Sequence, residues 1–235
     1  MGLDEVHVAK VAKRYGLERA LAGVTLTLKG GSMCALLGHN GAGKTTLLGV
    51  LSTLVRPSSG KVEYRASGTE LVGDRVRGEI GLLAHASLCY GELTAIENLE
   101  LFAGLYGLDD AATTCVRMLE QVGLDKRAWT RPARTYSRGM WQRLALARAL
   151  LAKPSLILLD EPFTGLDRDG ALALGEQLGS LTSSGAIVVV VTHDLEAIAG
   201  RADHVAILRR GNLVFEERGA YSYEQLKDVY HRHAA

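Results

Sequence analysis

Residues Gly38 to Thr46, GHNGAGKTT, have the composition and spacing of a phosphate-binding loop. Its glycines would let backbone N–H groups approach the β- and γ-phosphates of a nucleotide, Lys44 would neutralise their charge, and the Thr45 hydroxyl would ligate Mg²⁺. The apolar run MCALL before the loop and TTLLGVLSTL after it predict a strand and a helix, which an ordinary glycine turn would not require. ATP with Mg²⁺ is therefore the expected ligand, bound by Gly38, His39, Asn40, Gly41, Ala42, Gly43, Lys44, Thr45 and Thr46.

Two acids follow a second apolar run, LILLDEP. A strand ending in Asp160 would place this carboxylate at the carboxyl edge of the sheet, beside the phosphate loop, where it can hold Mg²⁺ or its water shell. Glu161 would then face the γ-phosphate and could accept a proton from an attacking water or orient it. The alternative is that the two acids only cap the next turn.

A histidine follows a third buried run, VVVVTHD. The His193 side chain can donate a hydrogen bond to charge that develops on the γ-phosphate. A histidine after a strand is more often structural when it occurs alone, so the interpretation depends on the other two motifs.

The elements that must position these residues alternate between strands and helices, which predicts an α/β fold built on a P-loop NTPase core, with a mostly parallel sheet flanked by helices. VHVAKVAKRY and GVTLTLKGG alternate with period two and predict an N-terminal antiparallel β piece. Three helical patterns between Thr94 and Lys153 predict a helical insertion, and HVAILRRGNLVFE predicts a hairpin with its turn at residues 210–212. We expect one domain over 1–235, with 1–84 and 154–235 as the nucleotide-binding core and about 85–153 as the helical part.

The composition limits the partners. The 235 residues are 47% hydrophobic and carry a net charge of +1, so a full core is expected and nucleic-acid binding is not. The N-terminus lacks the features of a signal peptide and the apolar runs are too short to span a bilayer, which predicts a cytoplasmic chain with reduced cysteines at positions 34, 89 and 115. His231 and His233, in the tail HRHAA, are expected to be solvated at a frayed end.

The order of these motifs over residues 4 to 218 resembles the nucleotide-binding subunits of ATP-binding cassette (ABC) transporters. By that resemblance Tyr15 stacks on adenine, and Asp167 ends a loop, TGLD, that crosses a subunit boundary. Tyr136 to Met140, YSRGM, aligns with the family's Leu-Ser-Gly-Gly-Gln signature, keeping its serine and second glycine. Ser137 can cap the following helix and bond a phosphate, and Gly139 leaves its N–H uncovered, so this helix end can bind an anion. A plain capped helix is the alternative.

The resemblance implies that the signature of one subunit closes over the ATP held by another, in a homodimer or a heterodimer of such subunits. It also implies an integral-membrane transporter subunit as a partner, which would dock on the helical insertion and hold the chain at the cytoplasmic face of the cell membrane. His85 stands where the family has a glutamine that contacts Mg²⁺ or water. Either His85 replaces this glutamine as a catalytic and metal-binding residue, or its side chain lies outside the site.

Within this family, the chain most resembles the haem-exporter ATPases of cytochrome c maturation. The resemblance is in the stretches SRGMWQRLALARALL and LLDEPFTGLD. Haem export or release of a haem chaperone is therefore the first expectation for the cargo, with drug, lipid or polysaccharide export as the alternative. A soluble cassette in DNA or ribosome work would be expected to bring coiled coils, a second cassette or basic surfaces. The remaining alternative, a P-loop kinase of small molecules, would account for the phosphate loop and Asp160 but would not explain why YSRGM, TGLD and His193 occur together.

Overall fold

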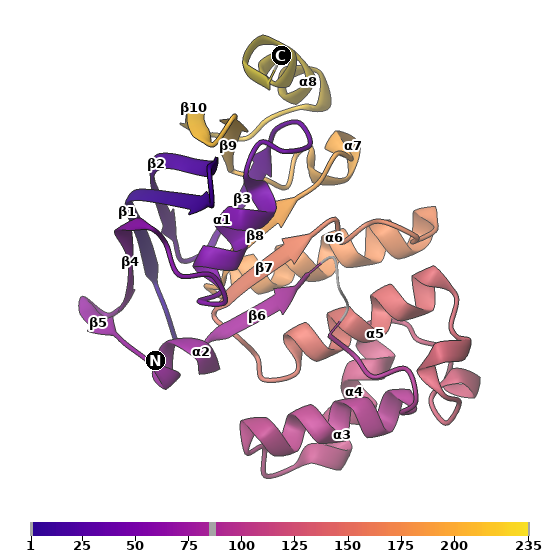
Figure 1. Ribbon diagram of the computed structural model, residues 1–235. Coiled ribbons are helices and arrows are strands. Elements are labelled where there is room, and N and C mark those ends of the chain that lie inside the picture. Colours follow the sequence, from indigo (N-terminus) through magenta and orange to yellow (C-terminus); the bar gives the residue numbers. More distant parts are fainter. Residues whose placement is uncertain (1, 85–87, 235) are drawn as a thin grey trace.

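The computed structural model describes residues 2–84 and 88–234 (Figure 1). Its strands are β1 Glu5–Tyr15, β2 Glu18–Lys29, β3 Ser32–Leu37, β4 Ser59–Ala66, β5 Thr69–Leu71, β6 Ile80–Leu83, β7 Leu156–Asp160, β8 Ile187–Val191, β9 His204–Arg209 and β10 Asn212–Arg218. Its helices are α1 Lys44–Leu51, α2 Asp74–Gly78, α3 Ala95–Tyr106, α4 Ala111–Gln121, α5 Arg138–Leu150, α6 Arg168–Ser183, α7 Leu195–Ile198 and α8 Tyr223–Ala234, with short 3₁₀ turns at Lys126–Ala128 and Ala133–Thr135.

The main sheet has the strand order β10-β9-β3-β8-β7-β6. The pairs β3–β8, β3–β9, β7–β8 and β6–β7 are parallel, whereas β10 joins β9 as an antiparallel hairpin through Arg210 and Gly211. Both the α/β fold class and the C-terminal hairpin are as predicted. Parallel order matters for the site because the loops that follow β3, β7 and β8 then leave the sheet at one edge.

The central strands are covered on both faces, as their continuous apolar runs predict. Successive side chains of a strand point to opposite faces of the sheet. Along β8, Val188 and Val190 enter a core shared with α3, α4, α5 and α6, whereas Ile187, Val189 and Val191 enter a second core shared with α1. The sheet is thereby fixed between two apolar layers, which gives its carboxyl edge a rigid base.

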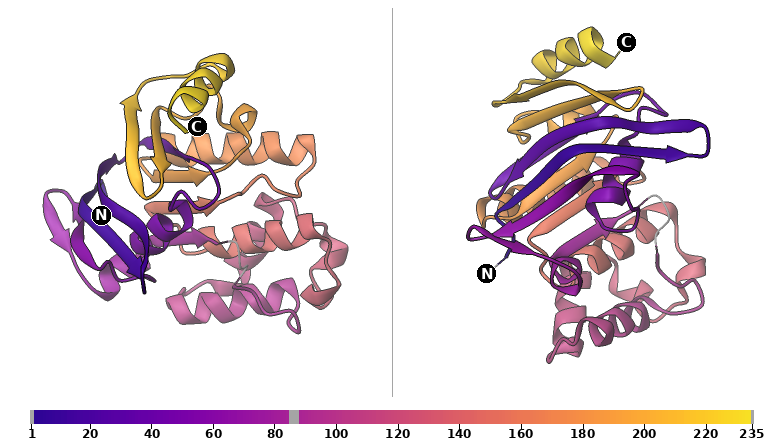
Figure 2. Two further views of the ribbon diagram at one scale, coloured as in Figure 1. Left: turned by 45° about the horizontal axis from the view of Figure 1, so that its top comes forward. Right: turned by 60° about the vertical axis from the view of Figure 1, so that its left-hand side comes forward.

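The second core is closed by the predicted antiparallel piece, a four-stranded sheet of order β2-β1-β4-β5. Figure 2 shows this sheet as a separate layer across the parallel one, in indigo and purple. The sequence patterns identified β1 and β2 but not β4 and β5, which contain the exposed residues Ser59–Lys61 and Thr69–Glu70.

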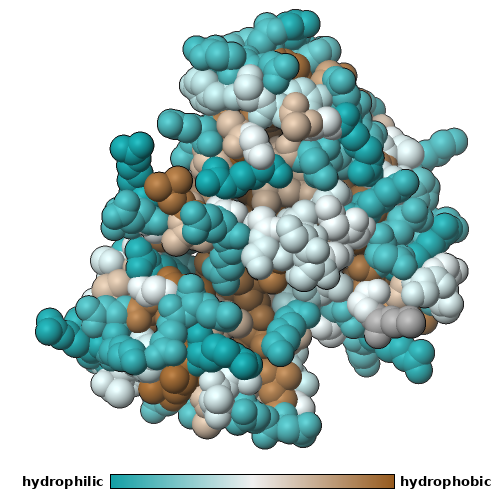
Figure 3. Space-filling view, turned by 180° about the vertical axis from the view of Figure 1, so that it is seen from behind, coloured by the Kyte–Doolittle hydropathy of each residue, from teal (hydrophilic) through white to brown (hydrophobic). Residues whose placement is uncertain are grey.

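The helices α3, α4 and α5 all lie between β6 and β7 in the chain, although these two strands are neighbours in the sheet. The sequence therefore located the helical insertion correctly. Helix α3 begins with a capping box in which Thr94 and Glu97 bond each other's backbone N–H. Seen from behind in Figure 3, hydrophobic side chains gather in a hollow beside these helices. A cavity of about 850 Å³ is lined by residues of α4, α6 and the end of α5, among others.

The C-terminal residues differ from the expectation of a frayed tail. They form helix α8, which packs on the β9–β10 hairpin (Figure 1). The His233 ring lies against Phe215 with 4.7 Å between ring centroids, so of the two tail histidines only His231 is exposed. Cys34 and Cys115 are buried and Cys89 half-buried, and all three are free thiols, as expected. No helix within residues 2–84 and 88–234 has the length and apolar character that a membrane span needs.

His204, the first residue of β9, is fully buried. Its Nε2 lies 3.2 Å from Glu216 Oε1, and its Nδ1 has no hydrogen-bond partner among the described residues. Burial lowers the pKa of this imidazole, and the charge of Arg218 lowers it further, against the opposing carboxylates of Glu216 and Asp203. The folded protein therefore resists protonation of His204 more than the unfolded chain does.

We expect the free energy of unfolding to fall as the pH drops below about 6.5, the ordinary histidine pKa, because the unfolded chain then binds a proton that folded His204 resists. Urea unfolding at pH 7.5 and 5.5 measures this loss, which one such group limits to about 1.4 kcal/mol per pH unit. His204→Gln keeps an N–H donor for Glu216 but does not titrate, so it should lose less stability over this range. An equal loss in both proteins would contradict the assignment.

Candidate nucleotide-binding site

The loop from Gly38 to Gly43 joins β3 to α1, as the sequence predicts. Gly43 has φ +106°, and a Cβ there would lie 2.5 Å from the Ala20 carbonyl oxygen. Gly38 has φ +142° and packs equally tightly on the Leu208 carbonyl. Because only glycine accepts both the left-handed backbone and the close contact, these two residues fix the path of the loop up to the start of α1.

Lys44 lies within this loop and is buried. Its Nζ donates hydrogen bonds to the carbonyl oxygens of Gly38, at 2.6 Å, and His39, at 3.0 Å. Burial lowers the pKa of Lys44, whereas the charges of Glu161 and Asp160 raise it. The ammonium group is thus held by two carbonyl groups of the loop and lies close enough to Glu161 and Asp160 to feel their charge.

Thr45 and Asp160 bring two oxygen atoms together from α1 and the end of β7. Thr45 Oγ1 donates to Asp160 Oδ2 at 3.0 Å. Hard oxygen donors suit Mg²⁺, which usually takes one or two protein ligands and fills its octahedron with water and phosphate oxygens. This pair therefore fits a Mg²⁺ ion held together with a nucleotide, and the described residues contain no cluster of three or more acids, histidines and cysteines that would suit a metal held by protein alone.

Glu161 and His193 meet at the same edge of the sheet, after β7 and β8. Glu161 Oε1 lies 3.4 Å from His193 Nε2, and Glu161 Oε2 accepts the backbone N–H of His193 at 3.3 Å. The sequence placed both residues near the γ-phosphate but did not indicate that they contact each other. The side chains are 28% and 49% exposed, so water can reach both.

The backbone of Glu161 is unusual, since its φ of +51° is rare for a residue with a side chain. Its N–H donates to the Val191 carbonyl of β8 at 2.8 Å, which holds the end of β7 against its neighbour. A strained residue at the end of a central strand is typical of a functional site.

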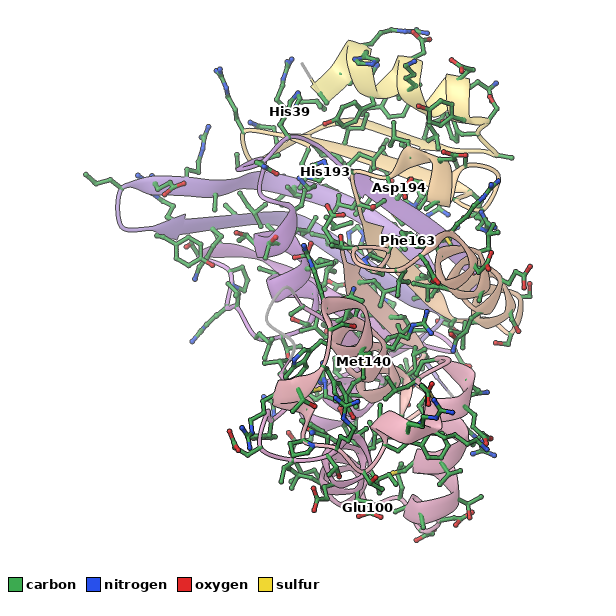
Figure 4. The ribbon with its side chains drawn as sticks, turned by 90° about the vertical axis from the view of Figure 1, so that its right-hand side faces the viewer. His39, Glu100, Met140, Phe163, His193 and Asp194 are labelled. Carbon is green, nitrogen blue, oxygen red and sulfur yellow. The ribbon has the colours of Figure 1, made fainter. Side chains whose placement is uncertain are left out.

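Figure 4 faces this edge of the sheet and labels His39 in the phosphate loop, His193 after β8 and Met140 in the first turn of α5. Ser137 caps α5 by accepting the N–H of Met140 at 3.3 Å, as predicted. A Cβ on Gly139 would lie 2.5 Å from the Gly165 carbonyl oxygen, so α5 begins directly against the TGLD loop. The side chain of Arg138 lines a cavity of about 510 Å³ together with Asp160 and Glu161.

Asp167 and Tyr15 have local contacts that their motifs did not indicate. Asp167 caps α6 by accepting the N–H of Gly170 at 3.1 Å and pairs with Arg143 at 3.3 Å. The half-exposed Tyr15 ring lies 5.0 Å from Lys13 Nζ and lines a cavity of about 230 Å³ that also includes Thr45. Tyr15 therefore lies close to the phosphate loop, and its contact with adenine stays a prediction, as does nucleotide binding by Asp167.

The phosphate loop also has a partner that sequence patterns did not indicate. The His39 ring packs edge-on against Tyr230 of α8 with 5.6 Å between centroids, and Tyr230 Oη lies 3.4 Å from His39 Nδ1. The two residues are 191 positions apart, so no local spacing could connect them. His85, the predicted substitute for the family glutamine, lies outside the described residues.

These features define a P-loop domain built to bind a nucleoside triphosphate with Mg²⁺. Comparison with known proteins specifies the family, because residues 21–164 match the family model described as ABC transporter. The chain belongs to the ABC transporter family, and its fold and motifs are those of an ABC-type ATPase domain.

Two relatives show how far the likeness extends. The chain is 39% identical over 208 residues to the "Daunorubicin resistance ATP-binding protein DrrA3" of Streptomyces coeruleorubidus, covering 87% of this chain and 65% of the relative. It is 32% identical over 224 residues to the "Lantibiotic transport ATP-binding protein SrtF" of Streptococcus pyogenes, covering 93% and 94%. The chain thus spans less than two thirds of the daunorubicin-resistance protein but nearly all of the lantibiotic-transport protein.

A solved structure extends the comparison to three dimensions. It is a dimer of the ATP-binding cassette MJ0796 in a post-hydrolysis state, bound to ADP and Pi. The match has a TM-score of 0.82 and 29% sequence identity, and covers 91% of this chain and 98% of the other. The α/β fold class with its antiparallel and parallel sheets is thereby confirmed.

Proposed function

We propose that this chain is the ATP-hydrolysing subunit of an exporter and drives a separate integral-membrane subunit from the cytoplasmic face of the membrane. The observation that carries the proposal is the convergence of Lys44, the Thr45–Asp160 pair and the Glu161–His193 pair at one edge of the sheet. In this arrangement Lys44 can bind phosphate, the oxygens of Thr45 and Asp160 can hold Mg²⁺, and the Glu161 carboxylate lies beside His193. These are the groups that hydrolysis of a terminal phosphate needs.

In the proposed reaction, a water oxygen forms a bond to the γ-phosphorus while the bond from that phosphorus to the β,γ-bridging oxygen breaks. Glu161 orients the water and accepts its proton, and ADP leaves with the electron pair of the broken bond. His193 donates a hydrogen bond to the γ-phosphate, and Lys44 offsets its charge. Mg²⁺, held through Thr45 and Asp160, would neutralise charge on the phosphate oxygens.

We propose further that two such chains, or this chain and a relative, enclose ATP between them. The N-terminus of α5 carries Ser137 and Gly139, and the intervening Arg138 lines a cavity with Asp160 and Glu161 but with no residue of the phosphate loop. An anion-binding helix end that does not serve its own loop can serve the γ-phosphate held by a second chain. The dimeric MJ0796 cassette supports this arrangement.

For the cargo we propose a drug-like or peptide antibiotic. Both relatives named above are described by resistance to, or transport of, such compounds, and neither name concerns haem. The first expectation from sequence, haem export in cytochrome c maturation, therefore finds no support among them, whereas the alternative of drug export does. The YSRGM signature that suggested haem export is compatible with either cargo.

The cargo is tested by expressing the chain with the integral-membrane protein encoded beside it, in a host sensitive to both daunorubicin and a lantibiotic. We expect the minimum inhibitory concentration of one of these compounds to rise several-fold. The Lys44→Ala variant should abolish the rise, because export would need ATP binding. Unchanged sensitivity to both compounds, with c-type cytochromes restored in a host defective in their maturation, would reject antibiotic export and favour haem.

A further inference from the structure

Gln142 is one turn beyond the cap of α5 and is half-buried. Its side-chain Nε2 donates two hydrogen bonds, one to the carbonyl oxygen of Glu161 and one to that of Pro162, each at 3.1 Å. Both acceptors belong to the backbone that leaves β7. One amide group therefore ties the signature helix to the residue that carries the reacting carboxylate.

The position of these bonds matters because Glu161 has a left-handed backbone. Such a conformation is strained for a residue with a side chain and persists only where its surroundings fix it. The Glu161 N–H donates to the Val191 carbonyl of β8, and the Glu161 carbonyl accepts both Gln142 Nε2, at 3.1 Å, and the Thr164 N–H, at 3.2 Å. With both ends of the residue held, the direction of its side chain is set toward His193.

Gln142 also lies beside the carboxylates of the candidate site. It lines the cavity of about 510 Å³ that contains Asp160, Glu161, Arg138 and Thr164. The carboxylates of Asp160 and Glu161 thus share a cavity wall with the side chain that fixes their backbone. A loss of the two hydrogen bonds would remove the side-chain donor from the Pro162 carbonyl and leave the Glu161 carbonyl with the Thr164 N–H alone, at 3.2 Å.

We propose that Gln142 is a positioning residue for ATP hydrolysis: it holds the Glu161 backbone so that the carboxylate meets the attacking water. The inference rests on the proposed ATPase function and deepens it by adding a residue from the signature helix to the hydrolytic machinery of the same chain. Gln142 acts on the Glu161 backbone and does not touch the nucleotide. Its effect should therefore appear in kcat and not in nucleotide affinity.

The test compares the wild-type chain with Gln142→Met and Gln142→Glu. Methionine keeps the length of the side chain without donors, and glutamate presents acceptors where the two carbonyls need a donor. We expect kcat to fall by about 10- to 100-fold in both, the size of effect that a displacement of about 1 Å can cause. The dissociation constant of a fluorescent ATP analogue and the KM for ATP should change less than about threefold.

A double-mutant cycle with Glu161→Gln separates positioning from general loosening of the fold. If Gln142 acts through the Glu161 carboxylate, Gln142→Met should cause almost no further loss of turnover once that carboxylate is gone. Additive losses in the double variant, or a kcat within twofold of wild type for Gln142→Met, would overturn the proposal. Gln121→Met, the same change on the exposed end of α4, is the matched control and should leave turnover unchanged.

Thermal unfolding of each variant identifies a folding defect, and Gln142→Glu provides the second measurement if the methionine variant unfolds. The failure of this inference is distinguishable from failure of the proposed function. Without ATPase activity in the wild-type chain, alone or with its membrane partner, the proposed function fails. With wild-type activity and unaffected Gln142 variants, only the positioning role fails.

Discussion

Glu161→Gln is expected to slow ATP turnover by about 10²–10⁴-fold, the usual contribution of a positioned proton acceptor. An amide of the same size can still meet His193, at 3.4 Å from Oε1 in the wild-type chain, but it cannot take the proton from water. ATP should still bind, because Lys44 and the Thr45–Asp160 pair are intact. A steady-state phosphate-release assay measures the change in kcat.

The same variant should accumulate as an ATP-bound dimer, since the γ-phosphate that we propose bridges two chains is no longer removed. Size-exclusion chromatography with ATP and Mg²⁺ should show this dimer, whereas ADP should give the monomer. Glu120→Gln changes an exposed carboxylate of α4 that pairs with Lys126, and it serves as the control with unaltered turnover. A Glu161→Gln chain that stays monomeric in ATP would argue against the shared nucleotide site.

Lys44→Ala should weaken ATP binding itself. Hydrogen bonds to a charged group contribute about 1.5–3 kcal/mol, so we expect the dissociation constant for ATP to rise by about 10- to 150-fold. The substitution also removes a positive charge that offsets the negative charge of the γ-phosphate in the transition state. We therefore expect kcat to fall by about 10²–10³-fold at saturating ATP. Isothermal titration calorimetry and single-turnover hydrolysis separate the two effects.

Lys126→Ala is the matched control for this change, because Lys126 is an exposed lysine in a surface ion pair. Its ATP affinity and turnover should equal those of the wild-type chain. Undiminished ATP binding by Lys44→Ala would remove Lys44 from the phosphate site. It would leave the 2.6 Å hydrogen bond to the Gly38 carbonyl as a purely structural contact.

The sequence predicted the groups that are close along the chain and the edge of the sheet at which they meet. GHNGAGKTT predicted the loop between β3 and α1, and the apolar runs before Asp160 and His193 predicted two buried parallel strands. These succeed because local spacing and strand parity determine where a side chain emerges from a sheet. The cap at Ser137 was also predicted correctly, because helix capping depends on the residue that directly precedes the helix.

What the sequence did not predict depends on contacts between distant segments. The contact of His39 with Tyr230 joins residues 191 positions apart, and the sequence analysis did not identify the helix that supplies Tyr230, whose last residues were expected to be a frayed tail. Gln142 could have been noticed in the sequence as an amide among the arginines and leucines of α5. Its half-burial and its two carbonyl partners, which follow a strand, become apparent only in three dimensions. The strands β4 and β5 were missed because exposed polar residues make up much of their length.

The contact between Gly139 and Gly165 explains which positions of the signature sequence tolerate other residues. Any side chain at position 139 would collide with the carbonyl oxygen of Gly165, so the helix could start there only by moving away from its neighbouring loop. Arg138 is exposed and Met140 half-buried, and neither position carries that steric restriction. The pentapeptide Tyr136–Met140 can therefore differ from the Leu-Ser-Gly-Gly-Gln signature at positions 138 and 140 and still keep the close contact between the start of α5 and the TGLD loop.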